Sequence, residues 1–449
     1  MLGRAARGLT PRLGTALRAR GGGTAAAVSD EPFDLVVVGG GVMGAWTAVC
    51  AAKRGAKVCL ADQYMPAHEH GSSHGDGRIY RLAYSEDVYV DMMLHSLPLW
   101  KELQTFAAEP LMHQTGGLNM APNGGGRLEA QGELYARRGI EHEWLTAAEV
   151  NERFPQFGLT PDLHGLYQPD YGVLFASKCV DAAWRYASSL GAETRTPFRA
   201  SAVRVVDGVT IVDGADGSSL RAKTLVLALG AWMSPLVDEL LGVRIPSTVT
   251  AETVAFYKPK ADGPPIDHSY KSMPVFVPET DNGLGPFGYY GLPMIDIGGI
   301  KASAHYAGPI VHPDKRPKAA GGLVERPAEE EAAAEAQVDA VLASTSKYIS
   351  ETFPHVEHEP FLTQSCLYTS TVDHDYVISR VPGHPSVIVL GGGSGHAFKM
   401  GPAIGDAAVS LAFGEEPPFD VERFDVARLI QLEKEGGELD HNKVAPPRR

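Results

Sequence analysis

One stretch near the N-terminus, residues 33–62 (FDLVVVGGGVMGAWTAVCAAKRGAKVCLAD), constrains the fold more than any other part of the chain. It opens with a β-branched run, Leu35–Val38, which is the pattern of a strand buried on both faces. Three glycines follow in G-x-G-x-x-G spacing: Gly39, Gly41 and Gly44. In such a turn the glycines permit a tight bend, close approach of a pyrophosphate and close packing of helix on sheet.

The end of the same stretch strengthens this interpretation. A second apolar run, Val58–Ala61, ends at Asp62, which lies 18 residues after Gly44. A carboxylate at this distance can accept hydrogen bonds from ribose hydroxyls. The helix between the two runs would offer its N-terminal N–H groups to the pyrophosphate. We therefore expect a dinucleotide-binding βαβ unit rather than a glycine-rich turn without a ligand.

Composition excludes several classes of protein. The chain has 449 residues, enough for two closely joined domains. It contains no run of 18 apolar residues, so we expect no transmembrane helix and no membrane partner. A net charge of −14 argues against a nucleic-acid partner. The four cysteines show neither metal-binding spacing nor a dense disulfide pattern.

Residues 1–29 have the composition of a targeting segment. They contain five arginines and no acidic residue, and alanine and glycine dominate the rest. This composition is typical of an organelle transit peptide. The alternative is a disordered basic tail without a function.

The segment after Asp62 allows two interpretations. His68, His70 and His74 could ligate zinc, but no acid or cysteine completes a tetrahedral set at the usual spacing. In the alternative, which we favour, the glycines of this segment form a loop against the cofactor. Arg78 and Arg81 would then face an anion.

The remaining pattern predicts alternating helices and strands. Helical patterns cover residues 88–106, 147–154, part of 173–190, and 328–353. Strand patterns cover 202–212, the segment up to 229, several segments between 248 and 301, and 386–390. Residues 111–170 are glycine-rich and suggest strands and loops. The apolar run 224–232 is expected to return to the cofactor sheet.

Three further blocks resemble the monomeric sarcosine oxidase and pipecolate oxidase family: GSSHGDGRIYRLAY (71–84), GIKASAHY (299–306) and SCLYTSTVDHDYVIS…GGGSGHAFKMGPAIG (365–405). With the N-terminal turn, the resemblance covers residues 33 to about 425. It implies an α/β (α+β) fold, a glutathione-reductase-like Rossmann FAD-binding domain with an interleaved antiparallel-sheet substrate domain. It also implies oxidation of a secondary amino acid by FAD, with O2 reduced to H2O2, in a monomer.

The resemblance assigns roles to individual residues. Cys366 matches the cysteine that bonds covalently to the 8α-methyl of FAD, and Lys301 matches a lysine held over the flavin that assists O2 reduction. Arg81 and Lys399 match the pair that holds the substrate carboxylate, and His305, Tyr290 and Tyr368 match residues beside the substrate. The remaining matches lie next to the flavin: His74, Arg78, Gly395, His396 and Phe398.

The chain departs from the family pattern at two places near the site. Gly77 stands where sarcosine oxidases commonly have threonine, so one hydroxyl near the flavin is expected to be missing. The loop Glu279–Gly285 is longer than in the bacterial enzymes and borders the substrate cavity, which leaves the choice between sarcosine, pipecolate, N-methyltryptophan and a glycated amino acid open.

The expected domain organisation is interleaved. Residues 1–29 form the leader, residues 30–425 the oxidoreductase and residues 426–449 a tail. The FAD-binding parts are about 33–110, 170–245 and 360–425, and the substrate domain comprises about 111–169 and 246–359. Two other functions remain open: a dehydrogenase of the same fold that uses an electron carrier, and a non-catalytic flavoprotein that acts as an assembly factor.

The leader indicates a mitochondrial location, with the chloroplast as an alternative. Related enzymes are peroxisomal, but this chain ends in APPRR rather than in a tripeptide of the Ser-Lys-Leu type.

Overall fold

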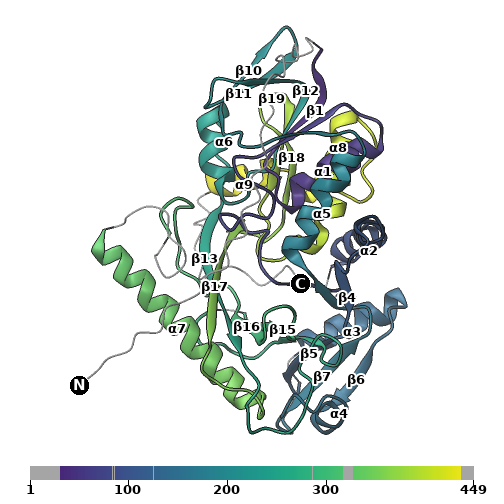
Figure 1. Ribbon diagram of the computed structural model, residues 1–449, viewed down its shortest axis with the longest axis vertical. Helices are drawn as coiled ribbons and strands as arrows, with labels where there is room; N and C mark the ends of the chain where they lie inside the picture. The colour runs from purple at the N-terminus through teal and green to yellow at the C-terminus, as the bar shows by residue number, and fades with distance from the viewer. Residues whose placement is uncertain are drawn as a thin grey trace, which may run out of the picture.

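A mixed sheet with a parallel centre forms the upper half of the molecule (Figure 1). The computed structural model describes residues 31–435 except residues 83, 85, 125, 286 and 317–326, so the predicted leader lies outside the described residues. The strand order is β10 (Ala200–Val206), β11 (Val209–Gly214), β12 (Ser219–Leu227), β1 (Phe33–Val38), β2 (Val58–Ala61) and β9 (Glu193–Arg195). β19 (His384–Gly391) pairs with β12 and with β18 (Val377–Val381).

The register of this sheet confirms the predicted βαβ unit. β1 pairs in parallel with β2 on one side and with β12 on the other. The run at residues 224–232 therefore does return to the cofactor sheet, through β12. The turn after Val38 opens at the centre of the sheet, where the carboxyl ends of parallel strands meet and ligands bind in such folds.

Helices cover both faces of this sheet (Figure 1). One face carries α1 (Val42–Lys53), α5 (Ala176–Ser189) and α8 (Gly401–Phe413), with α2 (Asp87–Ala107) packed outside them. The other face carries α6 (Met233–Leu241) and α9 (Ala427–Lys434). The alternating side chains of β1 divide between these two cores, Leu35 and Val37 in the first and Val36 and Val38 in the second. Burial on both faces explains the uninterrupted apolar run.

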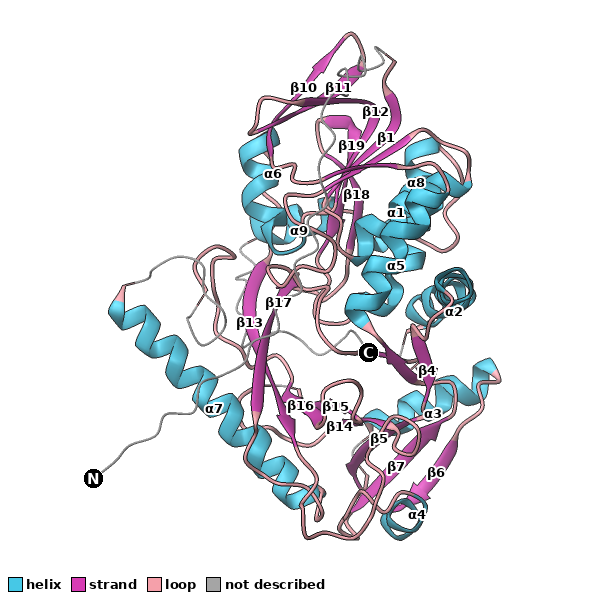
Figure 2. Ribbon diagram, in the orientation of Figure 1, coloured by secondary structure: helices cyan, strands magenta, loops and turns pink. Residues whose placement is uncertain are grey.

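A second, mostly antiparallel sheet forms the lower half (Figure 2). Its strand order is β17 (Leu362–Ser370), β13 (Thr248–Tyr257), β16 (Ile300–Ala304), β15 (Tyr289–Leu292), β14 (Val275–Pro278), β5 (Gly117–Pro122), β7 (Leu163–Gln168) and β6 (Glu143–Thr146). The helix α7 (Ala328–Thr352) packs on β13 and β16, whereas α3 (Arg127–Arg138) and α4 (Ala147–Arg153) lie at the other end. A small third sheet contains β3 (Arg78–Tyr80), β8 (Gly172–Leu174) and β4 (Met112–Gln114).

The structure corrects two expectations. Residues 111–170 contain the twelve-residue helix α3, whose signal was masked by its neighbouring glycines. Residues 362–370 form β17 of the second sheet, because this strand pairs with β13 along its length, although the sequence placed them with the FAD-binding part. β14 pairs in parallel with β5, whereas the other strand pairs of the second sheet are antiparallel, as expected for the substrate domain.

Within the described residues, no helix combines the length and apolar character needed to cross a membrane.

Candidate functional site

The glycine turn is held by close backbone contacts that leave no room for side chains. Gly39 has a φ of +101°, and a Cβ there would lie 2.2 Å from the carbonyl oxygen of Ala228. A Cβ at Gly44 would lie 1.8 Å from the carbonyl oxygen of Gly39. Glycine is therefore required at both positions, the first for its backbone conformation and the second for helix packing against the turn.

Asp62 lies directly against this turn. Its Oδ2 accepts a hydrogen bond from the Gly40 N–H at 2.6 Å, and its Oδ1 accepts one from the Tyr64 N–H at 2.8 Å. His68 lies 3.7 Å from the same carboxylate. These contacts orient the carboxylate at the end of β2, which is where a ribose hydroxyl would meet it.

Two adjoining cavities meet at the turn. The larger measures about 210 Å³ and the smaller about 120 Å³. Both are lined by Gly41, Ser72, Ser73, Ala228 and Gly230. Asp62 lines the smaller cavity, and the predicted substrate-side residues line the larger one. This geometry suits an elongated ligand whose middle lies at the N-terminus of α1.

The larger cavity is rich in basic side chains. Its wall contains Arg78, Arg81, Lys301 and Lys399, and no aspartate or glutamate of the described chain lines it. Buried charges in proteins are normally paired, because removing an ion from water costs about several kcal/mol. Among the described residues Asp76 lies close enough to Lys301 to raise its pKa but is not part of the wall, so a ligand can supply negative charge inside the cavity.

Unpartnered polar atoms in the wall point to the same conclusion. The Nε2 of His74 and the Oγ of Ser365 are buried without a hydrogen-bond partner in the described structure, and both residues line the larger cavity. A bound group with its own donors and acceptors would satisfy them. The residues present thus fit the FAD that the family resemblance implies.

Lys301 reaches the cavity from the middle of the second sheet. It lies on β16 between Phe256 and Leu292 of the neighbouring strands, and only 5% of its surface is exposed. Its Nζ donates a hydrogen bond to the Gly77 carbonyl oxygen at 3.2 Å. Burial, reinforced by Arg78, lowers the pKa of Lys301 to about 7.

The space beside Gly77 is already filled. A Cβ at Gly77 would lie 2.5 Å from Cδ1 of Ile295 and 3.0 Å from Cδ2 of Leu292. The volume that a threonine side chain would need is therefore occupied by these two apolar residues. Lys301 donates a hydrogen bond to the carbonyl oxygen of Gly77 itself.

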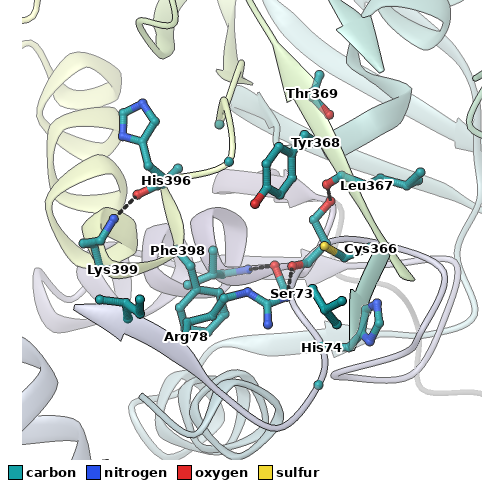
Figure 3. Close-up of a pocket in the computed structure, with 18 of the residues that line it drawn as sticks. Ser73, His74, Arg78, Cys366, Leu367, Tyr368, Thr369, His396, Phe398 and Lys399 are labelled. Carbon is teal, nitrogen blue, oxygen red and sulfur yellow. Dashed lines mark hydrogen bonds between the residues drawn. The ribbon is translucent and has the colours of Figure 1, made fainter. Parts of the chain in front are cut away.

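Cys366 lies on β17 in the wall of the same cavity (Figure 3). Burial raises the pKa of its thiol, whereas the nearby Arg78 and Lys301 act in the opposite direction. The other three cysteines are also buried, but they lie in the hydrophobic cores and line neither of the two cavities. Cys366 is thus the one cysteine of the described chain with access to a ligand in these cavities.

An aromatic group surrounds His305. The ring of Tyr290 lies 5.4 Å from the His305 ring and that of Tyr368 lies 5.7 Å from it, both edge-on. The Oη of Tyr368 lies 3.4 Å from Nδ1 of His305. Burial, with Arg81, lowers the pKa of His305 to about 3, so this imidazole is neutral at physiological pH.

Arg81 and Lys399 are far apart in the sequence, and both lie in the wall of the larger cavity. The Nζ of Lys399 donates a hydrogen bond to the carbonyl oxygen of His396 at 2.7 Å (Figure 3). It also donates one to Oη of Tyr84 at 2.9 Å. Burial, together with Arg81, lowers the pKa of Lys399 well below its usual value. Lys399 is positioned by the short helix Phe398–Met400, whose backbone accepts a hydrogen bond from Trp100.

The remaining predicted flavin neighbours also line this cavity: His74, Arg78, Gly395, His396 and Phe398. The guanidinium of Arg78 donates to the Gly77 and Ser72 carbonyl oxygens, each at 2.9 Å. The backbone N–H of His396 donates to the Gly393 carbonyl oxygen at 2.9 Å. That N–H group is therefore used within the turn and is not directed at a ligand. His68 and His70 pack against the ring of Tyr64, with ring centres 4.8 Å and 4.3 Å away.

Sequence reasoning missed several residues around the site. Tyr84 contacts Lys399, and Tyr306 packs edge-on against Tyr368 at 5.3 Å. Phe287 stacks on Tyr306 at 4.8 Å and also packs against His374. Tyr84 lies within the block 71–84, so its place next to Arg81 in the sequence was a usable signal. No local signal connects Phe287 with Tyr306 and His374, because three separate loops bring them together.

Comparison with known proteins places the chain among redox enzymes. A family profile described as FAD dependent oxidoreductase matches residues 34–411. The chain is 28% identical to human peroxisomal sarcosine oxidase, over 91% of this chain and 99% of that protein. It is 30% identical to a monomeric sarcosine oxidase of Bacillus sp. (88% and 97% covered) and to an N-methyl-L-tryptophan oxidase of Citrobacter koseri (89% and 100% covered).

Solved structures agree with the fold. The open form of NikD, an amino acid oxidase essential for nikkomycin biosynthesis, superposes with a TM-score of 0.72 over 88% of this chain and 97% of that chain. The identity is 24%, so this similarity concerns the fold. The predicted mixed α/β architecture with two large sheets is confirmed.

Proposed function

The chain belongs to the FAD dependent oxidoreductase family, and from this premise we propose that it oxidises the secondary amine of an amino acid, such as sarcosine or L-pipecolate, to an imine while O2 is reduced to H2O2. Its relatives named sarcosine oxidase and N-methyl-L-tryptophan oxidase support this reaction. We further propose that the chain acts as a monomer, as the name of the Bacillus relative says of that protein.

The cationic wall of the larger cavity carries the proposal. Arg81 and Lys399 would bind the carboxylate of the amino acid, because the planar guanidinium fork matches a carboxylate and the ammonium adds a second charge. A wall that contains two arginines and two lysines, with no carboxylate among its described residues, disfavours a protonated amine. The site therefore favours the amine in its neutral form, which keeps the nitrogen lone pair needed for oxidation.

Bound FAD supplies the redox chemistry, accepting two electrons from the CH–NH group and passing them to O2. His305, Tyr290 and Tyr368 would enclose the amine. The neutral His305 adds no further positive charge beside it. Lys301 would place a positive charge where O2 is reduced. The sheet that contains β1 would hold FAD, and the sheet that contains β16 would form the substrate side, with Cys366 bonded covalently to the flavin.

A panel of amines tests the proposed reaction. We expect H2O2 release with sarcosine, L-pipecolate, N-methyl-L-tryptophan or a glycated amino acid, and little release with dimethylamine, the analogue of sarcosine without its carboxylate. The physical reason is that only the amino acids supply the anion that the cations lack. Purified protein that contains FAD but oxidises none of these amino acids would contradict the proposed function and favour a non-catalytic role.

We propose a mitochondrial location from the composition of residues 1–29. We expect residues 1–35 fused to a fluorescent protein to enter mitochondria, because a basic segment without acids is typical of transit peptides. The human relative is named peroxisomal, so the full chain should be imaged beside the fusion with markers for both organelles. Fluorescence of the fusion in the cytosol would exclude the leader as a targeting signal.

A further inference from the structure

Two cations of the larger cavity converge on one neutral phenol, Tyr84. The Nζ of Lys399 lies 2.9 Å from Oη of Tyr84 and 5.4 Å from the centre of its ring. The guanidinium carbon of Arg81 lies 5.6 Å from the same ring centre, and Arg81 also interacts with the phenol oxygen. Neither cation forms an ion pair with an acidic side chain in the described part of the chain. Tyr84 is therefore the group that Arg81 and Lys399 share.

The surrounding hydrogen bonds define what the phenol can do. His396 Nε2 lies 3.1 Å from the His374 carbonyl oxygen, so this nitrogen carries the proton and donates. His396 Nδ1 is then an acceptor, and Oη of Tyr376 at 2.6 Å donates to it. Tyr84 Oη is a more distant neighbour of the same Nδ1, at 3.4 Å. Since Nδ1 has one lone pair, Tyr376 occupies it, and the Tyr84 oxygen remains available to accept from Lys399.

Burial keeps Tyr84 uncharged. It raises the pKa of Tyr84 to about 12, so the side chain is a neutral phenol at physiological pH. A phenolate in this place would neutralise one cation and compete with an anionic ligand. A neutral oxygen instead accepts hydrogen bonds and adds no negative charge beside Arg81 and Lys399.

We propose that Tyr84 is a positioning residue, whose neutral oxygen holds Lys399 and Arg81 together as a ready-made binding site for the carboxylate of the substrate. The inference rests on the proposed function, in which these two cations bind that carboxylate. Two like charges this close repel each other, and without a shared acceptor one of them would turn away or lose its proton. Tyr84 reduces this cost before the carboxylate arrives, which is preorganisation of the site.

Tyr84→Phe is the direct test. The variant keeps the ring that stacks on Tyr89 at 5.0 Å and removes only the oxygen. We expect the KM for the amino acid and the Kd for acetate, measured by the change in flavin absorbance, each to rise about tenfold. The rate of anaerobic flavin reduction at saturating substrate should change less than threefold. The split between KM and this rate distinguishes positioning of the carboxylate from general damage.

Tyr257→Phe is the matched control. Tyr257 is a buried tyrosine whose phenol hydrogen bond, to Ser346 at 3.2 Å, would likewise be lost, but this bond lies between the second sheet and α7 rather than at Lys399. Its KM and acetate affinity should equal those of the wild type, and the Tm of both variants should be similar. Equal losses of acetate affinity in the two variants would overturn the proposal.

A second variant shows whether Tyr84 acts through Lys399. In the Lys399→Met background, Tyr84→Phe should weaken acetate binding much less than in the wild type, because the partner is absent. Simple addition of the two losses would overturn the proposal.

Binding of acetate and acetamide distinguishes failure of the proposed carboxylate site from failure of the proposed role of Tyr84. Wild-type protein that binds acetate no better than acetamide would refute the carboxylate site and the proposed function with it. Acetate binding that is specific in the wild type and unchanged in Tyr84→Phe would refute the role of Tyr84 alone.

Discussion

Lys301→Met should slow the reaction of the reduced enzyme with O2 by about 100-fold or more, while reduction of the flavin by substrate changes much less. Adding an electron to O2 creates a negative charge inside a cavity that is shielded from water. At a distance of about 4 Å and an effective dielectric of about 20, one cation contributes ~4 kcal/mol to such a charge. Each ~1.4 kcal/mol corresponds to about tenfold in rate.

Stopped-flow absorbance of the flavin follows the two half-reactions separately. Lys347→Met is the matched control, because Lys347 lies on the surface of α7 with 74% of its side chain exposed. Its two rates should equal those of the wild type. If O2 reactivity is unchanged in Lys301→Met while flavin reduction collapses, Lys301 binds substrate and its proposed role is wrong.

The lowered pKa of Lys301 predicts that the rate of the O2 reaction depends on pH. The pKa of Lys301 is lowered to about 7 by burial, so the side chain is a cation below this pH and loses its proton as the pH rises through it. The O2 reaction of the wild type should therefore slow as the pH increases through about 7, with a midpoint displaced upward by any negative charge of the bound flavin. Lys301→Met should show no such step, because methionine does not titrate.

Cys366→Ala should abolish covalent attachment of the flavin. Cys366 lines the larger cavity beside Arg78 and Lys301, and its sulfur can reach a ligand there. A thioether to the 8α-methyl would form with loss of one hydrogen from sulfur and one from the methyl group, and the two electrons would reduce the flavin itself. Acid precipitation should leave the yellow colour in the wild-type pellet and in the supernatant of Cys366→Ala.

The control for this experiment is Cys179→Ala. Cys179 is also buried, but its Sγ interacts with the Leu111 carbonyl oxygen at 3.2 Å and it lies in the hydrophobic core. Its variant should keep the flavin in the pellet. Flavin in the supernatant of the wild type would show that the cofactor is bound without a covalent bond, and mass spectrometry of the peptide around Cys366 would confirm either result.

The sequence alone determined the features that depend on local patterns. The glycine spacing after β1, the apolar run into Asp62 and the place of both in one βαβ unit could be read directly, because close backbone contacts at Gly39 and Gly44 exclude other residues. The long helix at α7 and the run that forms β12 were equally visible, since their periodicity extends over many residues. The blocks around Cys366, Lys301 and Lys399 indicated a site before any geometry was known.

Only the tertiary structure decided how distant segments meet. The pairing of β17 with β13 places Cys366 in the second sheet, and strand pairing between residues far apart leaves no mark in a local pattern. The packing of Ile295 and Leu292 into the space beside Gly77 is likewise invisible in the sequence. The proposed role of Tyr84 depends on Lys399, which lies more than 300 residues later in the sequence and donates a hydrogen bond to it. A side chain's charge and partners depend on burial and on neighbours brought together by folding, whereas a motif records only residue types and their spacing.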